Sequence, residues 1–511
     1  MKTTQNGDPR TNILIIYTGG TIGSVHSVEG NLLSPLRPAQ KDDFEKQIEG
    51  IGKTGIAFDV IGIKPVEPSQ FSDEELETDG TIKPLDSSNV EAKHWLAMAA
   101  AVEANYAAFD GFVILHGTDT MAYTASALSF LLENLAKPVV ITGSQLPIFA
   151  ARTDAKQNLI NALYIAGYRA TGLPLVPEVI ICFADRVLRG NRTRKVSSTS
   201  WAGFDTPNCQ HLGEIGEHIT INTEFVRPPA DNSRHRMRAH TRLMEGILDI
   251  SVYPGLRPSD LKAILRLDGV KGIVFRGFGS GNAPDNRAFL DAVAEGTKDK
   301  TIINVTQCTQ GMVEMGLYAA SSGLQERGVI SGLDMTPEAA LAKLMYLLTT
   351  QRGPDLQLEM QQSLRGEQSV NLYDVRYGEK GNSKEGLEKA EDQKRPPGPF
   401  QKDKLTRAVL RVSGVGVQNV KVGDPIKLRV FIGLVDDSQL TAEIPNSPEY
   451  AGEVAASYEG EDKTTLILDI TSTLQQVYTK DGSPIYVTLV ARDGQKFWYR
   501  GLFINLFAKA D

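Results

Sequence analysis

The chain has 511 residues, 41% of them hydrophobic and 23% charged, a composition typical of a globular protein with roughly two to four domains. Its formal net charge of −8 gives no electrostatic reason to expect nucleic acid or an anionic membrane as a partner. The three cysteines are too few and too scattered for a disulfide framework or a zinc site. No apolar run approaches the roughly 20 residues that span a bilayer. The N-terminal segment MKTTQNGDPRTN lacks the apolar region of a secretory signal, so we expect a cytoplasmic protein.

Short strands and helical patterns alternate over the first 210 residues. A helix is predicted from near Thr120, because apolar residues recur there at helical spacing. The alternation predicts an α/β domain over residues 11–210, with a parallel sheet covered by helices on both faces. In such sheets, ligands bind beyond the carboxyl ends of the strands. The strands are predicted at 12–17 (NILIIY), 111–115 (GFVIL), 138–142 (PVVIT) and 177–183.

A second α/β pattern follows a stretch without strong periodicity. Residues 211–245 are expected to form a connector with an irregular or edge segment, and residues 246–375 a second α/β domain. Strands are predicted in this domain at 271–275 and 301–305, and helices at 285–295 and 337–350.

The composition changes again near residue 376. Residues 376–404 are charged, interrupted by Gly and Pro and poor in apolar residues, which predicts a linker. Residues 405–511 alternate between apolar and polar positions, which predicts an all-β sandwich. This sandwich carries no catalytic pattern, and its role is left open.

The first predicted strand ends in Thr18-Gly19-Gly20-Thr21, here called the TGGT turn. Glycines permit positive φ and let a substrate approach backbone N–H groups closely. A threonine at such a position can act as a nucleophile when a base activates it. Two interpretations are open on this motif alone, namely a plain strand-to-loop turn and a turn that presents the Thr21 hydroxyl.

Residues 116–120, here called the HGTDT loop, connect a predicted strand end to a helix start, so they should face the same edge as the TGGT turn. An aspartate such as Asp119 can hold a substrate ammonium group, and helix N–H groups can hold a carboxylate. Capping of the helix explains Asp119 and Thr120 equally well. His116 is interpreted as structural, since no second histidine stands at metal-ligand spacing.

Residues 189–195, here called the RGNRTRK segment, follow the fourth predicted strand. A basic run is ordinarily a solvated loop. Because this one is expected to leave a strand on the side of the other motifs, Lys195 is a candidate to reach them. A partly buried lysine with a lowered pKa can serve as a base.

These motifs occur together and in a fixed order, as TGGTI, HGTDTMAYTASALSF, ITGSQLP, RGNRTRK, GNAP and TQC. In this combination the chain from about 11 to 370 resembles L-asparaginases of the bacterial type I, or cytoplasmic, class. The resemblance implies a two-domain asparaginase-like core, here followed by the predicted sandwich. It also implies hydrolysis of L-asparagine to L-aspartate and ammonia through a threonine acyl-enzyme.

The resemblance assigns roles to individual residues. Thr21 is implied as the nucleophile, and Thr118, Asp119 and Lys195 as a second catalytic group in which Thr118 is hydrogen-bonded to Lys195. Asp119 is also implied to bind the substrate ammonium. No metal or cofactor is required by this chemistry, and none is expected. The other implied substrate contacts are Gly20, Asp86, Ser87, Ser88 and, from a neighbouring subunit, Asn282.

Assembly and regulation are implied by the same resemblance. A homodimer or homotetramer is expected, with each site completed by a neighbouring subunit, and neither nucleic acid nor a membrane is expected as a partner. Some type I enzymes bind asparagine at a regulatory site, whose matching positions here are Arg276, Thr306, Gln307 and Cys308.

One position departs from the family pattern. Many bacterial relatives have a lid tyrosine shortly after the nucleophile, and here that position is Asn31. We predict Tyr318 as the substitute, reaching Thr21 of a partner subunit as Asn282 is expected to do. A role for Tyr318 as an interface or core aromatic is equally open.

Two other functions are compatible with these motifs. One is an amidase subunit of a tRNA-dependent transamidation complex, which would carry a further N-terminal domain, whereas the core here begins near residue 12. The other is a non-catalytic asparagine-sensing or interaction protein. The intact Thr21, Thr118, Asp119 and Lys195 count against the second, and the missing lid tyrosine counts for it.

Overall fold

The structure is a computed structural model of the chain. Its described residues are 11–27, 35–48, 56–231, 233–315, 319–350, 356–377, 381–382, 387–394, 396, 400–413, 415–418, 421–434, 447–457, 464–478, 483–491, 496–499 and 501–510. Asn31 and Tyr318 lie outside them.

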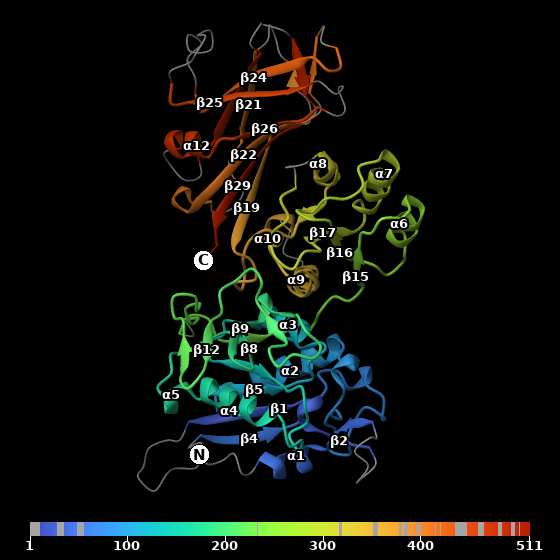
Figure 1. Ribbon diagram of the computed structural model, residues 1–511, viewed down its shortest axis with the longest axis vertical. Helices are drawn as coiled ribbons and strands as arrows, with labels where there is room; N and C mark the ends of the chain where they lie inside the picture. The colour runs from blue at the N-terminus through green and yellow to red at the C-terminus, as the bar shows by residue number, and fades with distance from the viewer. Residues whose placement is uncertain are drawn as a thin grey trace.

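The first domain is built on an eight-stranded sheet, at the bottom of Figure 1. Five neighbouring strands are parallel and three are antiparallel. The inner strands are buried along their whole length and rich in Val and Ile, which is expected of strands covered on both faces. In sheet order they are β13 (Ile219–Ile221), β12 (Gly213–Ile215), β9 (Arg186–Arg189), β8 (Val179–Phe183), β7 (Val139–Thr142), β5 (Gly111–Leu115), β1 (Asn12–Tyr17) and β4 (Ala57–Ile61).

Helices cover both faces of this sheet, as the alternation of strands and helices predicts. Leu14 and Ile16 of β1 pack with α2 (Ala92–Asn105) and α3 (Met121–Leu131). Ile13 and Ile15 of the same strand pack with α1 (Lys41–Ile48) and α4 (Ala155–Ala166) on the other face. The predicted connector 211–245 supplies the sheet edge, since β13 is the outermost strand.

The second domain is a four-stranded parallel sheet with helices on both faces. Helix α9 lies between this sheet and α3 of the first domain, because its apolar residues belong to the same core as α3 and β16. The strands are β15 (Ile247–Ser251), β16 (Gly272–Gly277), β17 (Thr301–Thr306) and β18 (Ile330–Ser331). The helices are α6 (Pro258–Leu265), α7 (Arg287–Gly296), α8 (Ala319–Glu326), α9 (Pro337–Thr350) and α10 (Leu356–Met360).

The C-terminal part is a sandwich of two four-stranded antiparallel sheets, with a smaller three-stranded sheet beside them. A continuous apolar core lies between the sheets, which confirms the all-β prediction. One sheet contains β19 (Val370–Tyr377), β29 (Gly501–Lys509), β22 (Leu405–Ser413) and β26 (Leu466–Asp469). The other contains β21 (Leu387–Lys394), β27 (Ile485–Ala491), β24 (Pro425–Ile432) and β25 (Tyr450–Ser457).

The predicted linker 376–404 differs from the structure. Its first residues complete β19, which pairs along its length with β29, and β21 falls in its middle and pairs with β27. Strand β21 has the sequence LEKAEDQK and is the outermost strand of its sheet. Edge strands commonly carry charge, which prevents pairing with other chains, and that composition is easily taken for a linker.

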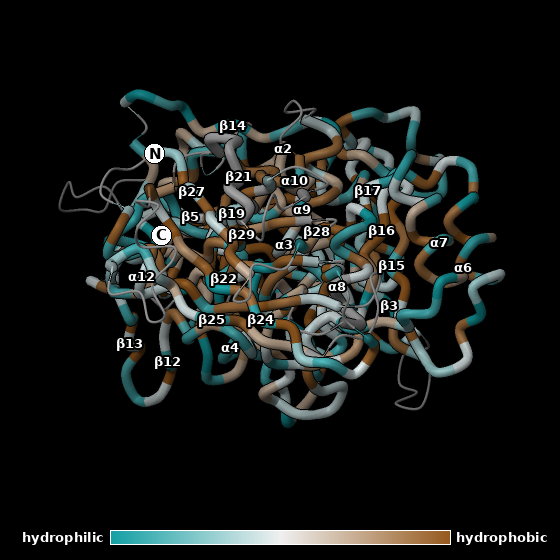
Figure 2. The backbone as a smooth tube through the Cα atoms, turned by 90° about the horizontal axis from the view of Figure 1, so that it is seen from above, coloured by the Kyte–Doolittle hydropathy of each residue, from teal (hydrophilic) through white to brown (hydrophobic). Residues whose placement is uncertain are grey.

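Hydropathy follows this architecture. Figure 2 shows hydrophobic segments along the interior strands and hydrophilic segments at the periphery, for example at β13. None of the helices in the described part of the chain combines the length and apolar character that crossing a bilayer demands.

Candidate active site

The TGGT turn is held against two other loops by its glycines. Gly19 and Gly20 have φ of 105° and 80°, a region that favours glycine. A Cβ on Gly19 would lie 2.4 Å from Leu85 O, and one on Gly20 would lie 2.3 Å from Gly117 N. Only a residue without a side chain therefore lets the turn contact both the loop after Leu85 and the HGTDT loop.

The two threonines of the turn have different environments. Thr18 is buried, and its hydroxyl donates to Leu115 O at 2.8 Å. Thr21 is the first residue of the short 3-10 helix η1 (Thr21–Gly23) and is only partly buried, while Ile22 beside it is fully buried. The Thr18 hydroxyl is therefore structural, whereas Thr21 is partly accessible to solvent.

Residues 86–88, here called the DSS loop, lie against the HGTDT loop. Asp86 caps the short helix η4 (Ser87–Asn89) by accepting hydrogen bonds from the backbone N–H and the hydroxyl of Ser88. Ser87 is buried, and its Oγ accepts from the N–H of Asp119 at 3.2 Å while its carbonyl accepts from the Thr120 hydroxyl at 2.7 Å. The DSS loop and the HGTDT loop thus form one surface beside the TGGT turn.

Lys195 joins this surface through its ammonium group. Its Nζ lies 2.8 Å from Thr118 Oγ1 and 2.6 Å from Asp119 Oδ1. The Lys195 side chain is 21% exposed and that of Asp119 is 63% exposed, so the carboxylate faces solvent while the ammonium is largely covered. The structure brings Lys195 to Thr118 and Asp119 as predicted, although it follows them by 77 and 76 positions in the sequence.

The route of the RGNRTRK segment to this place differs from the sequence interpretation. Strand β9 intervenes after β8 and runs antiparallel to it, so the segment begins at the amino end of β8, where Arg189 pairs with Ile180. The chain then passes through η5 (Gly190–Arg192) and returns to the carboxyl edge at β10 (Arg194–Lys195). Residues 190–194, at about 3.3 Å per residue, are enough to cover the length of the five-residue strand β8, which accounts for this return.

Arg192, which the sequence reasoning did not single out, fixes the segment along this route. It is almost completely buried, and its guanidinium donates to Asp334 Oδ2 at 2.7 Å, Glu367 O at 2.7 Å and Ser369 Oγ at 2.9 Å. The Lys195 segment is thereby tied to the second domain and to the chain that enters the sandwich. The one sequence signal that could have pointed to Arg192 is its place in the RGNRTRK segment, three residues before Lys195.

His116 has both ring nitrogens occupied. Its Nδ1 lies 2.7 Å from Gly117 O, and its Nε2 lies 2.9 Å from Thr124 Oγ1, which in turn accepts from Trp95 Nε1 at 2.9 Å. This chain of donors is complete when Nδ1 carries the proton and the ring is neutral. Burial lowers the pKa of His116 to about 4. The ring therefore connects α2, α3 and the HGTDT loop.

The predicted regulatory residues lie together at the carboxyl edge of the second sheet. Arg276 and Thr306 are on the neighbouring strands β16 and β17, and Gln307 Nε2 donates to Arg276 O at 2.8 Å. Thr306 Oγ1 accepts from the N–H of Cys308 at 2.9 Å. The Arg276 guanidinium forms an ion pair with Asp249.

Asn282 lies in the second domain, in the loop that follows β16. Its backbone pairs with Phe278, and its Oδ1 is buried without a hydrogen-bond partner among the described residues. None of the hydrogen bonds of Asn282 within the described ranges goes to the TGGT turn.

Tyr17, the tyrosine nearest the TGGT turn in the sequence, does not supply a phenol to Thr21. Its hydroxyl donates to Ala39 O at 2.9 Å, its ring stacks on Phe44, and burial raises its pKa. The two tyrosine-related positions of the sequence analysis, Asn31 and Tyr318, are outside the described residues.

Comparison with known proteins matches the two α/β domains to two family models. Residues 12–227 match the model described as "Asparaginase, N-terminal", and residues 248–359 match "Glutaminase/Asparaginase C-terminal domain". Both matches end before β19. The sandwich thus lies beyond the matched part of the chain.

Individual relatives agree with the family models. The chain is 40% identical to L-asparaginase 1 of Escherichia coli K12 over 362 residues, which are 70% of this chain and 98% of that protein. It is 37% identical to a mouse 60 kDa lysophospholipase over 383 residues, covering 72% of this chain and 64% of that one. The crystal structure of L-asparaginase I from Vibrio cholerae superposes with a TM-score of 0.59 at 37% identity, covering 71% of this chain and 100% of the other.

Proposed function

Because the chain belongs to the asparaginase family, whose members hydrolyse the side-chain amide of asparagine, we propose that it converts L-asparagine to L-aspartate and ammonia through an acyl-enzyme on Thr21. The observation that supports this most directly is the contact of Lys195 Nζ with Thr118 Oγ1, next to the TGGT turn that carries Thr21. A hydroxyl and a carboxylate of the HGTDT loop thus meet the Nζ of Lys195 from a separate segment, which is a combination that can serve a hydroxyl nucleophile.

In the proposed acylation step, Thr21 Oγ1 attacks the amide carbon, and its proton passes to the leaving nitrogen. The bond from carbon to nitrogen breaks, ammonia leaves, and an ester joins Thr21 to the substrate. Water then attacks this ester, the bond from carbon to Thr21 Oγ1 breaks, and the threonine hydroxyl regains a proton. We assign proton transfer to the pair of Thr118 and Lys195, since their hydrogen bond provides the path.

The tetrahedral intermediate requires donors for its oxyanion. The N–H of Gly20 is not available, because it donates to Leu85 O at 3.0 Å. We assign this role to backbone N–H of the HGTDT loop at Thr118. Gly20 then contributes to the site by permitting the close approach of the two loops.

Substrate binding is assigned to the two loops beside the turn. Asp119 is exposed and anionic, which suits the α-ammonium group. Ser87 Oγ accepts a hydrogen bond from the N–H of Asp119, so its own proton is free to be donated to the substrate carboxylate. Asp86, Gly20 and Ser88 complete the proposed contacts within the chain.

We propose the remaining features on the family resemblance. These are a homodimer or homotetramer in which Asn282 and Tyr318 of the partner subunit complete the site, and a cytoplasmic location. Regulation by asparagine is proposed at Arg276, Thr306, Gln307 and Cys308.

Light scattering of the purified protein tests the assembly. Sigmoidal dependence of rate on asparagine, lost in Thr306→Ala, tests the regulation.

The deciding experiment for the activity is steady-state ammonia release by the purified protein with asparagine and with glutamine. Stoichiometric formation of aspartate and ammonia supports the proposed function. A protein that binds asparagine without turnover would be a sensing protein. Release of ammonia only in the presence of a partner and charged tRNA would indicate an amidase subunit.

A further inference from the structure

A polar pocket lies at the opposite end of the first sheet from the TGGT turn. Its cavity of about 160 Å³ is bounded by the C-terminal end of α3, the residues that enter β8 and the chain around Arg365. Because the catalytic loops follow the carboxyl ends of the strands while Pro177 and Glu178 precede β8, the pocket is separate from the proposed active site.

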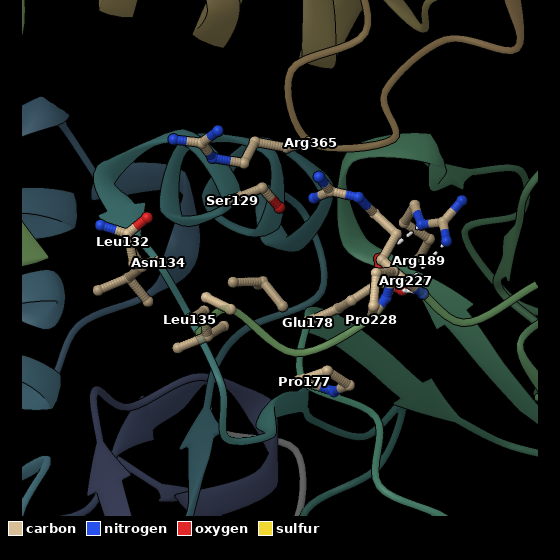
Figure 3. A pocket seen from close by; sticks show the side chains of 12 residues that line it. Ser129, Leu132, Asn134, Leu135, Pro177, Glu178, Arg189, Arg227, Pro228 and Arg365 are labelled. Atoms are coloured by element: carbon tan, nitrogen blue, oxygen red, sulfur yellow. Dashed lines mark hydrogen bonds and ion pairs between the residues drawn. The ribbon is translucent and has the colours of Figure 1, made fainter. Parts of the chain in front are cut away.

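Three arginines and one carboxylate line this pocket. Figure 3 shows the arginine side chains along its upper and right-hand side, with Leu135 and Pro177 below them. Arg189 is already neutralised, since its Nε and Nη2 donate to the two carboxylate oxygens of Glu178 at 2.6 and 3.0 Å. The pocket therefore has an excess of positive charge, supplied by Arg227 and Arg365.

The guanidinium groups of Arg227 and Arg365 converge on one neutral acceptor. Arg227 Nη2 lies 3.3 Å from Leu364 O, and Arg365 Nη1 lies 3.0 Å from the same oxygen. Two like charges so close repel each other unless an anion lies nearby. Burial lowers the pKa of Arg227; the charges of Glu178 and Glu367 oppose this lowering, and those of Arg189 and Arg365 add to it.

Donors remain available in this pair. The Nε of Arg365 is buried and has no hydrogen-bond partner among the described residues. The Arg227 guanidinium makes one hydrogen bond to the described residues, the one to Leu364 O. A guanidinium carries five N–H donors, so both groups have donors left for a ligand.

The neighbouring carboxylates are shared with other cations. Glu178 is bound by Arg189 and also accepts from the N–H of Arg227 at 2.8 Å. Glu367 is buried against Lys343, with 2.7 Å between Oε1 and Nζ. Glu133 forms an ion pair with Arg365, with 3.6 Å between Oε1 and Nη2, but it is shared with Arg238, so it neutralises Arg365 only in part.

We propose that this pocket binds a small oxyanion, a phosphate group or a carboxylate, between Arg227 and Arg365. The planar forks of two guanidinium groups match the oxygens of such an anion and bind it through charge-assisted hydrogen bonds. The cavity is far larger than the ~10–15 Å³ that one water needs, so the ion fits. This inference goes beyond the proposed hydrolysis and does not depend on it.

The test is isothermal titration calorimetry of the full chain with inorganic phosphate at constant ionic strength, with chloride as the reference. Malonate in a second series distinguishes a carboxylate site from a phosphate site. The double variant Arg227→Gln/Arg365→Gln removes both charges. Arg287→Gln is the matched control, because that side chain is 94% exposed on α7. We expect saturable binding to the wild type and the control, and at least tenfold weaker binding to the double variant.

The proposal is overturned if neither anion binds saturably to the wild type, or if the folded double variant binds as tightly as the wild type. Should the double variant not fold, Arg227→Lys and Arg365→Lys replace it, since each keeps the charge but loses the planar fork. Each lysine variant should then bind more weakly than wild type, and unchanged affinity in both contradicts the site.

Discussion

The two threonines of the TGGT turn differ in the burial and hydrogen bonding of their hydroxyl groups. That of Thr18 is buried and donates to Leu115 O, whereas Thr21 is partly accessible to solvent. The pair therefore offers a matched comparison between a structural and a nucleophilic threonine on the same few residues of backbone. The family resemblance pointed to Thr21, but the TGGT pattern by itself does not distinguish the two threonines, because the difference depends on which of them faces the neighbouring strand β5.

Thr21→Ala should abolish nearly all asparagine hydrolysis, because no hydroxyl remains to form the acyl-enzyme. Loss of an activated nucleophile typically lowers kcat by far more than a hundredfold. The measurement is steady-state ammonia release, together with aspartate binding by calorimetry, which should persist.

Thr18→Val is the control for Thr21→Ala. It removes one buried hydrogen bond and should lower the free energy of unfolding by about 1 kcal/mol while activity is retained. More than about a hundredth of the wild-type kcat in Thr21→Ala would exclude Thr21 as the nucleophile.

Lys195 and Thr118 should act as one unit. Because the hydroxyl and the ammonium lie 2.8 Å apart, Lys195→Met and Thr118→Val each interrupt the same proton path. We expect each single variant to lower kcat strongly and the double variant to be little worse than either. Losses that add in free energy would mean that the two side chains act independently.

At the scale of elements, the His116 ring joins α2 and α3 to the loop that carries Thr118. Its network requires the neutral imidazole, since Nε2 accepts from the Thr124 hydroxyl and Nδ1 donates to Gly117. Protonation would leave Nε2 with a proton directed at a hydroxyl that already accepts from Trp95. Acid should therefore loosen the contact between these elements.

This gives a prediction for stability against pH. The folded pKa of His116 is about 4, below its value of 6.5 in the unfolded chain, so the unfolded state binds more protons between these values. The stabilising contribution is fully present above pH 6.5 and is lost as the pH falls toward 4. About 2 kcal/mol of the free energy of unfolding should be lost between pH 7 and pH 5.

Urea unfolding at both pH values, in wild type and His116→Gln, measures this contribution. The loss between pH 7 and pH 5 should be smaller by about 2 kcal/mol in the variant. His218→Gln, at an exposed position, is the matched control and should follow the wild type. An equal loss in wild type and His116→Gln would contradict the assignment.

Strands and helices with clear periodicity could be predicted from the sequence, and the main sheet has them where expected. Strands β9 and β21 illustrate why other elements were not predicted. Strand β9 is short and basic at both ends, so no sequence pattern indicates a return strand before the RGNRTRK segment. Strand β21 is charged because it is an edge, and its sequence pattern does not differ from that of a linker.

The candidate site followed the same rule. Motifs at strand ends, together with the family resemblance, predict Thr21, Thr118 and Asp119, because parallel strands bring their carboxyl ends to one edge. Arg192 escaped because its role depends on Asp334 and on residues 367–369, which no local pattern connects with it.

At the scale of the whole molecule, the sandwich is attached to the second domain by an apolar contact and an ion pair. Leu333 packs against Leu372, Val409 and Phe507. Arg407 pairs with Glu314, in the loop that follows the predicted regulatory residues. This contact is remote from Thr21, so the sandwich is not expected to take part in the chemistry.

Truncation of the sandwich tests that expectation, but a cut near residue 378 is unsuitable. It would leave β19 without its partner β29. A chain that ends at Asn371 keeps Glu367 and Ser369, the anchors of Arg192. We expect this chain to fold and to keep its kcat, with a lower melting temperature because the Leu333 contact is exposed.

A chain that ends at Gln362 is the comparison for this truncation. It lacks Glu367, which leaves the ammonium of Lys343 buried without its partner, at a cost of about 3–5 kcal/mol. This shorter chain should fail to fold. A soluble and correctly assembled chain ending at Asn371 that is inactive would show that the sandwich contributes to the site.

The bond between Arg192 and the carbonyl of Glu367 also has a consequence for synthesis on the ribosome. The two residues are 175 positions apart, so at 5–20 residues per second the anchor is made roughly 9–35 s after the arginine. During that interval the first domain can complete its sheet, and the segment that carries Lys195 is held only by contacts within that domain, such as the pairing of β10 with residues 204–205. The nascent chain is therefore expected to acquire its fold early and its activity late, only after the last residues of the second domain have emerged.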